Sequence, residues 1–333
     1  MADFSASAPC KAILFGEHYV VYGSPALAIA IEPRNAVKFE SWDGDGIAMK
    51  SALGNGVISP TGEYGGPDEL GIFADVAAAV FKGKNLPSCA ATFEPAWKLK
   101  GVGTSASLCA AFAAGLFRLA GKKASPEEIF TAAQAGDLVA HGGRASGIDA
   151  KTVSYGCPLV FERSFSPPAF NSKPAKFALP KGSSLLLIDT NKGKREGTGK
   201  MLEVFAHQFG IGGTPEAAAE AQREAIREEY APLWAEIEKN LKESSPKKLG
   251  AIMNENHALL RKRKMSSPGI EKAVSAALSA GACGAKLTGG GGEGGAVLAL
   301  VETGNAAHIS EAISASTSFG CHVLSLAKKG AGA

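Results

Sequence analysis

The sequence lacks the features that mark membrane and secreted proteins. Its longest nearly apolar stretch, residues 109–117, is about half as long as a membrane-spanning helix. The first residues carry no basic segment before an apolar run, and Asp3 comes early, which disfavours a secretory signal. The six cysteines occur singly, with no C-x-x-C pair, and this spacing favours free thiols over a zinc site. We therefore expect a cytoplasmic protein with no membrane partner.

The sequence also has almost no excess of charge. It contains 35 Lys and Arg against 32 Asp and Glu in 333 residues, a formal net charge of +3. So balanced a chain creates no long-range field that would attract nucleic acid, and we expect no nucleic-acid partner. With 45% hydrophobic residues it is too apolar to be disordered. Its length suffices for two modest domains with proper cores.

Glycine, by contrast, is abundant: it occupies 41 positions, about one residue in eight against a typical 7%. Many of these glycines gather at boundaries between patterned segments. The clusters are Gly101 and Gly103; Gly142, Gly143 and Gly147; and the run 289–295. Because glycine lets the backbone turn tightly and approach a ligand closely, these clusters are candidate binding loops.

Strand and helix patterns alternate in both halves of the chain, which predicts an α+β fold. In the first half the expected elements are a strand at 10–15, helices at 70–82, 107–120 and 125–139, and a hairpin of strands 151–156 and 158–163. A proline-rich stretch leads to residue 180, where we expect the boundary between domains 1–180 and 181–333. In the second half the expected elements are strands at 184–189, 295–301 and 322–327, and helices at 215–241, 245–264, 267–281 and 305–316.

The segment GVGTSAS at 101–107 is a candidate phosphate site, because it precedes a helix that is apolar nearly all round. Backbone N–H groups in a glycine turn, together with the positive end of a helix dipole, bind phosphate. An ordinary helix N-cap is the alternative. The segment is neither G-x-x-x-x-G-K-[ST] nor G-x-G-x-x-G, which disfavours the common nucleotide folds. The candidate residues are Gly101, Val102, Gly103, Thr104, Ser105, Ala106 and Ser107.

Three further segments contain residues that could bind a ligand or take part in catalysis. The run 289–292, in KLTGGGGEGG, is expected between a helix and a strand, where it approaches a ligand or serves as a flexible linker. Asp149, in HGGRASGID, follows a glycine turn and precedes an expected strand; it is either a base or a turn former. Glu17 and His18, in FGEHYVVYG, interrupt an apolar run, so they either face a substrate or form a turn.

In order along the chain, these segments resemble the signature motifs of mevalonate kinases, in the superfamily of galacto-, homoserine, mevalonate and phosphomevalonate kinases. APCKAILFGEHYVVYG at 8–23 resembles the opening motif APGKVILFGEHAVVYG, and GVGTSAS resembles the phosphate loop GLGSSAA. KLTGGGGEGG resembles the third motif KLTGAGGGG, and ASGID at 145–149 resembles PSGID. The stretches 189–202 and 254–271 resemble a substrate loop and an N-H-x-L-L segment of the same family.

The resemblance implies two domains with the active site between them. The N-terminal domain would be like the second domain of ribosomal protein S5, and the C-terminal domain would be ferredoxin-like α+β. The family uses ATP and Mg²⁺ to phosphorylate the 5-hydroxyl of mevalonate in isoprenoid biosynthesis, and a homodimer is common in it. Two alternatives are a kinase for another small alcohol, such as phosphomevalonate or a sugar, and a nucleotide-binding regulator that has lost turnover.

The resemblance also implies roles for individual residues. Lys11 and Asp149 become the catalytic pair at the accepting hydroxyl, and Ser105 becomes a ligand of Mg²⁺. Because the substrate is an anion, Arg195 or Lys194 is the expected partner of its carboxylate. The residues expected to hold the substrate are Lys11, Glu17, His18, Asp149, Arg195 and Thr198. The third glycine motif contributes Gly289, Gly290, Gly291 and Gly292.

The chain departs from the family motifs at several positions. Cys10 replaces a glycine, and Glu293 puts an acid into the third glycine motif, where it would repel phosphates unless it points away or lies near Mg²⁺. The family's second metal ligand is a Glu four residues before a His. Asp137 precedes His141 by four residues and is our candidate, with a solvated helix residue as the alternative. HGGRASGID is one residue longer than HGNPSGID, so the motif alone leaves the register of this segment open.

Overall fold

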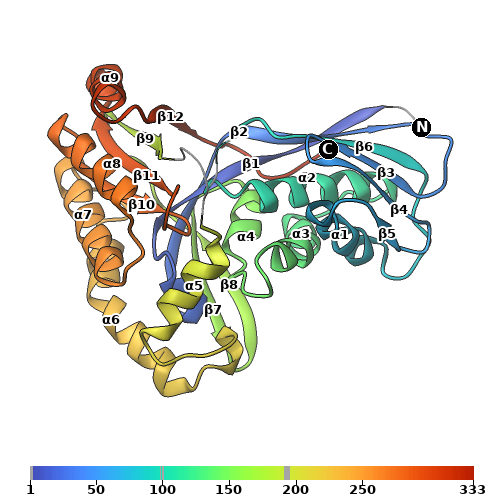
Figure 1. The fold of residues 1–333 in the computed structure, drawn as a ribbon, viewed down its shortest axis with the longest axis horizontal. Helices are drawn as coiled ribbons and strands as arrows, with labels where there is room; N and C mark the ends of the chain where they lie inside the picture. Colours follow the sequence, from blue (N-terminus) through green and yellow to red (C-terminus); the bar gives the residue numbers. More distant parts are fainter. Residues whose placement is uncertain (1–2, 98, 100, 191–195) are drawn as a thin grey trace.

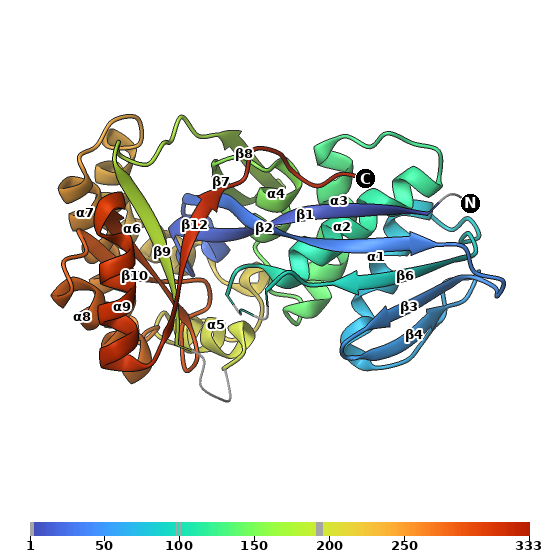
Figure 2. The same ribbon diagram turned by 90° about the horizontal axis from the view of Figure 1, so that it is seen from above.

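One sheet organises the molecule. The computed structural model describes residues 3–97, 99, 101–190 and 196–333, and in this part of the chain twelve strands are joined into a single sheet. Its main path runs β10-β11-β9-β12-β2-β6-β3-β4-β5, while β1 pairs with β2, and β7 pairs with β2 and β8. Figure 2 shows the long strands β1 and β2 extending from one half of the molecule towards β12 in the other. The sheet therefore continues from one half into the other.

The N-terminal half consists of a strand layer covered by helices. Its strands are β1 (Phe4–Phe15), β2 (Ala26–Glu40), β3 (Ile47–Ser51), β4 (Gly54–Ile58), β5 (Tyr64–Gly65), β6 (Cys89–Glu94), β7 (Leu159–Phe165) and β8 (Pro168–Pro174). Its helices are η1 (Tyr19–Tyr22), η2 (Asp68–Leu70), α1 (Ile72–Phe81), α2 (Thr104–Leu119), α3 (Pro126–Ala140) and α4 (Ile148–Tyr155). Figure 1 shows α1 to α4 on one face of β1, β2 and β6. The predicted helices at 70–82, 107–120 and 125–139 are confirmed with small shifts in their ends.

The sequence signals for α2 and α3 act in the structure as expected. Alanine and leucine make α2 apolar nearly all round, and it lies buried against β1 and β2. Ser125 caps α3 by accepting a hydrogen bond from the backbone N–H of Glu128, whose carboxylate accepts one from the N–H of Ser125. This capping box and Pro126 fix the start of the helix that carries Asp137.

The predicted hairpin at 151–163 is wrong in its first strand. Residues Ile148–Tyr155 form α4, and the hairpin consists of β7 and β8 instead. Gly147 begins the helix at φ 91° and Gly156 ends it at φ 67°, left-handed conformations that glycine adopts without strain. The β-branched and aromatic residues at 152–155 gave a strand signal that packing against α2 and α3 overrides. Asp149 therefore lies in the first turn of a helix rather than before a strand.

The C-terminal half stacks helices on the other end of the sheet. Its strands are β9 (Ser183–Asp189), β10 (Gly284–Thr288), β11 (Ala296–Glu302) and β12 (Gly320–Leu326). Its helices are α5 (Thr198–His207), η3 (Pro215–Ala217), α6 (Glu220–Lys239), α7 (Pro246–Lys262), α8 (Pro268–Ser279), η4 (Thr303–Asn305) and α9 (Ala306–Thr317). The predicted strands and helices of this half are confirmed within a few residues. The family resemblance of 189–202 implied a helix where α5 begins, and β10 was missed. The glycine run at 289–292 thus follows a strand, not a helix.

The predicted boundary at residue 180 falls between β8 and β9, and the chain crosses back after it. β12 pairs with both β9 and β2, and Ser7 forms a bridge with Gly332. Figure 1 shows the C-terminus on the N-terminal half. The α+β prediction is confirmed, while the division into 1–180 and 181–333 stays a prediction. Among the described residues, none of the helices is both long and apolar enough to span a membrane.

The contact between α7 and β10 predicts one stability effect. Gly250 and Gly284 let the two backbones touch: a Cβ on Gly284 would lie 2.2 Å from the carbonyl oxygen of Gly250. Because neither backbone can move away, we expect Gly284→Ala to lower the free energy of unfolding by about 2–3 kcal/mol in urea denaturation. Gly304→Ala is the control, since no atom lies within 4 Å of its Cβ position. Equal stability of the two variants would contradict this packing.

Candidate active site

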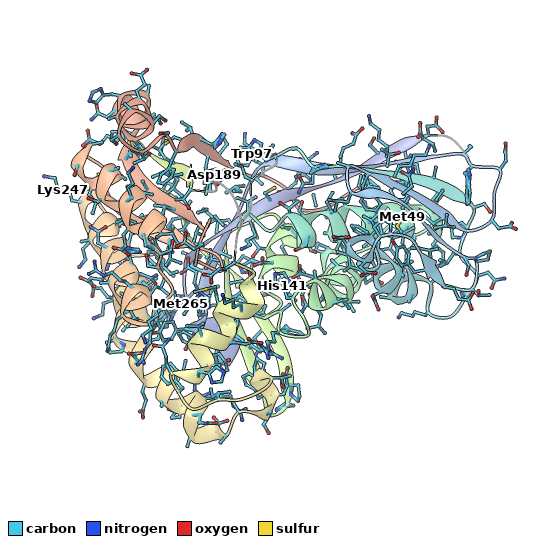
Figure 3. All side chains as sticks on the ribbon, viewed as in Figure 1. Met49, Trp97, His141, Asp189, Lys247 and Met265 are labelled. Carbon is cyan, nitrogen blue, oxygen red and sulfur yellow. The ribbon has the colours of Figure 1, made fainter. Side chains whose placement is uncertain are left out.

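A cavity of about 210 Å³ lies where the candidate motifs meet. It is lined by the end of β1, the first turns of α2, α4 and α5, the last turn of α3 and the third glycine motif. Figure 3 labels His141, which lies near the middle of the molecule, close to α4 and α5. Residues that are far apart in the sequence therefore surround one space.

The candidate phosphate loop, residues 101–107, leads into the first turns of α2, and part of it lines the cavity. Gly103 is the N-cap at φ 70°, and a Cβ there would lie 2.8 Å from Cγ of Lys11. Four of the seven candidates line the cavity: Gly101, Gly103, Thr104 and Ser105. The other three, Val102, Ala106 and Ser107, are fully buried. The Ser107 hydroxyl donates to the carbonyl oxygen of Ala8 at 3.0 Å, so it holds α2 against β1.

Lys11 and Asp149 meet inside this cavity. Lys11, on β1, is buried, and its Nζ lies 3.1 Å from Oδ1 of Asp149. Its backbone N–H donates to the carbonyl oxygen of Val102 at 2.9 Å, which fixes β1 against the phosphate loop. The first turn of α4 holds the Asp149 carboxylate at the positive end of the helix dipole, where a negative charge is favoured. A cation and a carboxylate are thus positioned beside the same loop.

Asp137 and Ser105 form a second polar centre. The Ser105 hydroxyl donates to Oδ1 of Asp137 at 2.9 Å, and Asp137 is 1% exposed, so it is not a solvated helix residue. Burial lowers the pKa of His141, but the Asp137 carboxylate outweighs this effect and raises it to about 9. A hydroxyl and a carboxylate are the hard oxygen donors that Mg²⁺ prefers, usually with phosphate oxygens and water completing its shell. Among the described residues no group of three His, Cys, Asp or Glu could hold a metal by itself.

His18 projects into the cavity from a strained turn. Its backbone has φ 64°, a left-handed conformation that is uncommon outside glycine, and its ring stacks on Phe205 of α5 at 5.6 Å between centroids. Burial lowers the pKa of His18 to about 4, so the imidazole is neutral near pH 7. Within the described structure neither ring nitrogen makes a hydrogen bond of full geometry, and the nearby Gly290 backbone offsets only part of the effect of burial on the pKa of His18. A buried, unpaired imidazole at a cavity wall is suited to a polar ligand.

Glu17 differs from the expectation that it contacts the substrate. Its side chain is fully buried outside the cavity lining and forms an ion pair with Lys286 of β10, which is also fully buried. Asn256 of α7 donates to the other carboxylate oxygen at 3.4 Å. Burial raises the pKa of Glu17, and the Lys286 ammonium opposes this only in part. Glu17 therefore joins the two halves of the molecule behind His18.

The third glycine motif lies against the phosphate loop. Gly289 and Gly290 line the cavity, and a Cβ on Gly289 would lie 3.2 Å from the carbonyl oxygen of Gly101. Gly291 and Gly292 instead pack on Met265 and Met201, where a Cβ would lie at 2.2 and 2.7 Å. Two of the four predicted glycines thus face the cavity, and a side chain is most strongly excluded at Gly291, where a Cβ would lie 2.2 Å from the backbone oxygen of Met265.

Glu293 lies outside the cavity lining and is exposed. Its backbone N–H donates to Oε2 of Glu196 at 3.2 Å, and its carbonyl oxygen accepts from the N–H of Glu196. Thr198, the first residue of α5, does line the cavity. Arg195 lies outside the described residues.

Sequence reasoning missed two residues near this site. Lys286 is the lysine of KLTGGGGEGG, and its signal was a charge within an otherwise apolar strand. Arg144 belongs to HGGRASGID and lines the cavity, where its Nη1 donates to Oε1 of Glu203 on α5 at 2.6 Å. The sequence feature that could have revealed Arg144 is the length of HGGRASGID, which is one residue longer than the family motif. Arg144 adds a positive charge to the loop between α3 and α4.

Comparisons with known proteins agree with this geometry. Residues 98–157 match the GHMP kinases N terminal domain, and residues 237–317 match the GHMP kinases C terminal domain. The mevalonate kinase of Thermococcus sibiricus is 32% identical over 321 residues, covering 89% of this chain and 88% of the relative. The chain belongs to the mevalonate kinase family. The mevalonate kinase of Aeropyrum pernix is 31% identical over 335 residues, covering 98% of this chain and 97% of the relative.

Solved structures show the same fold. The mevalonate kinase of Methanococcus jannaschii superposes with a TM-score of 0.77 at 19% identity, covering 98% of each chain. The galactokinase of Lactococcus lactis, complexed with galactose, superposes with a TM-score of 0.76 at 16% identity, covering 99% of this chain and 94% of that one. At these identities the likeness shows the fold alone. The resemblance to mevalonate kinases and the expectation of a kinase are confirmed.

The buried pair of Glu17 and Lys286 predicts a stability pattern for this protein. Replacing one partner leaves the other charge buried alone, so we expect Glu17→Gln or Lys286→Met to lower the free energy of unfolding by about 3–5 kcal/mol. The double variant removes both charges and should recover at least half of that loss. Urea denaturation measures all three. Single variants as stable as the parent, or a double variant whose loss is the sum of both, would contradict a coupled pair.

Proposed function

We propose that this protein transfers the γ-phosphoryl group of ATP to the 5-hydroxyl of mevalonate, giving 5-phosphomevalonate for isoprenoid biosynthesis. The observation that carries this proposal is the Lys11–Asp149 pair, at 3.1 Å beside the loop that begins α2. The curated relatives named above supply the substrate class. A mevalonate kinase of L. major, solved in complex with R-mevalonate, superposes with a TM-score of 0.74 at 22% identity, covering 97% of this chain and 96% of that one.

The phosphate loop would hold ATP. Phosphoryl transfer requires mainly positioning and neutralisation of charge on the transferring oxygens. The first N–H groups of α2 have no partner within a helix, and the helix begins at the cavity wall, so these groups and the positive end of the helix dipole would bind phosphate. The Lys11 ammonium adds a compact positive charge. Ser105 and Asp137 would hold Mg²⁺, which neutralises phosphate charge when it is bound.

Asp149 would act on the acceptor. Its carboxylate orients the hydroxyl and takes its proton as the bond to phosphorus forms. Lys11 touches the same carboxylate at 3.1 Å and so holds it beside the phosphate loop. His18 and Thr198 offer polar contacts. Ile13, Val20, Val21 and Leu202 also line the cavity, and these apolar side chains suit a methyl-bearing carbon chain. Glu17 acts through His18 as a positioning residue, and Arg195 stays a predicted substrate contact.

Release of ADP by the purified protein with Mg-ATP tests the proposed function. Mevalonate, phosphomevalonate, homoserine and galactose are offered in parallel, each with a no-acceptor blank. We expect turnover with mevalonate alone. Turnover with another acceptor would reassign the substrate, and ATP binding without turnover on any acceptor would favour a non-catalytic regulator.

The role of Asp149 predicts a loss of rate without a loss of nucleotide binding. Asn has nearly the same shape as Asp but cannot take a proton, so Asp149→Asn should lower kcat by about 10²- to 10⁴-fold. The KM for ATP should change little, because the carboxylate acts on the acceptor. Asp43→Asn, at an exposed surface position, is the control and should keep full activity. Near-normal turnover of Asp149→Asn would remove Asp149 from the mechanism.

The role of Asp137 predicts a changed metal requirement. Removing a residue that only contacts a metal ligand already weakens metal binding by about 10- to 100-fold. Asp137 is proposed as a direct ligand, so Asp137→Asn should raise the Mg²⁺ concentration for half-maximal rate at least about 10-fold. Titration of Mg²⁺ at a fixed, saturating ATP concentration measures this value, with exposed Asp68→Asn as the control. An unchanged Mg²⁺ requirement would show that another carboxylate is the ligand.

A further inference from the structure

Arg144 brings a positive charge to the cavity that the roles above do not use. It lies in the loop between α3 and α4, within the segment that is one residue longer than the family motif. The charged side chains that line the cavity, among described residues and apart from the histidines, are Lys11, Arg144, Asp137 and Asp149. Lys11 contacts Asp149, and Asp137 is held by Ser105 and His141. Arg144 thus differs from the other three in having its partner outside the cavity lining.

That partner is a weak one. Glu203 of α5 accepts a hydrogen bond from Nη1 of Arg144, and the Glu203 side chain is 52% exposed. Ion pairs with exposed carboxylates contribute little, because water and salt screen them. Within the described structure, Nη2 and Nε of Arg144 make no hydrogen bond to protein. A guanidinium with free N–H groups can exchange Glu203 for another carboxylate at small cost.

The Arg144 guanidinium lines the cavity next to α5, where it contacts Glu203. Tyr22 stacks on Phe205 of α5, and His18 stacks on the same ring. Arg144 lies close enough to Tyr22 to lower the pKa of its hydroxyl, although burial dominates and raises that pKa to about 12. Arg144 and His18 therefore both line the cavity and both contact α5, through Glu203 and Phe205, and this is where we place the acceptor.

We propose that Arg144, rather than the Arg195 expected from the sequence, binds the carboxylate of the acceptor and sets the preference of this enzyme for an acid over a neutral alcohol. The inference rests on the proposed function, since it takes mevalonate as the acceptor. The planar guanidinium offers two parallel N–H groups to the two carboxylate oxygens, a geometry that lysine cannot reproduce. Glu203 occupies part of the guanidinium until the substrate carboxylate replaces it.

The first test is Arg144→Gln, assayed at saturating ATP and Mg²⁺. Loss of charge-assisted hydrogen bonds to a carboxylate should raise the KM for mevalonate by about 10- to 100-fold, with kcat and the KM for ATP changed less than threefold. Arg144→Lys keeps the charge but loses the parallel pair, so its KM should lie between those of the parent and Arg144→Gln. The control is Arg118→Gln, whose guanidinium lies over Phe4 outside the cavity lining.

A second test separates carboxylate binding from a general effect on the site. The parent should use the primary amide of mevalonate with a kcat/KM about 10- to 100-fold below that of the acid. Arg144→Gln should use the acid and the amide almost equally, because the group that distinguishes them is gone. A general structural defect would lower kcat/KM for the acid and for the amide alike, so the ratio of the two values would stay as in the parent.

The outcomes distinguish the inference from the proposed function. Turnover of mevalonate by the parent with an unchanged acid-to-amide ratio in Arg144→Gln would overturn the role of Arg144 and leave the function standing. A rise in the KM for ATP instead would reassign Arg144 to the nucleotide phosphates and overturn the inference. Inactivity of the parent on both acceptors would remove the proposed function, and the inference would fall with it.

Discussion

The contact between Lys11 and Asp149 is the constraint on which the rest of the site depends. It requires β1 to end beside the phosphate loop, α4 to begin opposite it, and the loop to pass over Lys11 without a side chain at Gly103. The Lys11 backbone bonds to Val102, which ties the strand to the loop. Because both charges are held by their elements rather than by flexible loops, the pair is positioned before any substrate arrives.

A second charge pair sets how the two halves meet. Glu17 and Lys286 are both fully buried, and the Thr288 hydroxyl donates to the carbonyl oxygen of Ile13 at 2.8 Å, so β10 is joined to the end of β1 twice. The third glycine motif follows β10 directly and is thereby held against the phosphate loop. The same pair lies next to the strained turn that projects His18 into the cavity. Burial of two charges is costly, and here it fixes the register between halves.

Many residues singled out from the sequence line one cavity, although some elements around them were predicted wrongly. The glycine loop before α2 could be recognised because a helix start has a strong local signal, whereas Asp137 was singled out through the family resemblance. The strand expected at 151–156 is α4, since a short segment of mixed propensity takes the conformation that its packing allows. The burial of Glu17 could not be predicted, because the direction of a side chain in a turn depends on Lys286, 269 residues away. The position of Arg144 in the cavity could not be predicted, because it lies in a loop whose sequence has no helical or strand periodicity.

A crystal structure with Mg²⁺, mevalonate and a non-hydrolysable ATP analogue would test most directly whether the Lys11–Asp149 pair receives the acceptor. We predict that the 5-hydroxyl oxygen lies within about 2.6–3.2 Å of the Asp149 carboxylate, on the side facing the terminal phosphate. A 5-hydroxyl bound elsewhere in the cavity, with Lys11 and Asp149 still paired and no contact to either, would contradict that role.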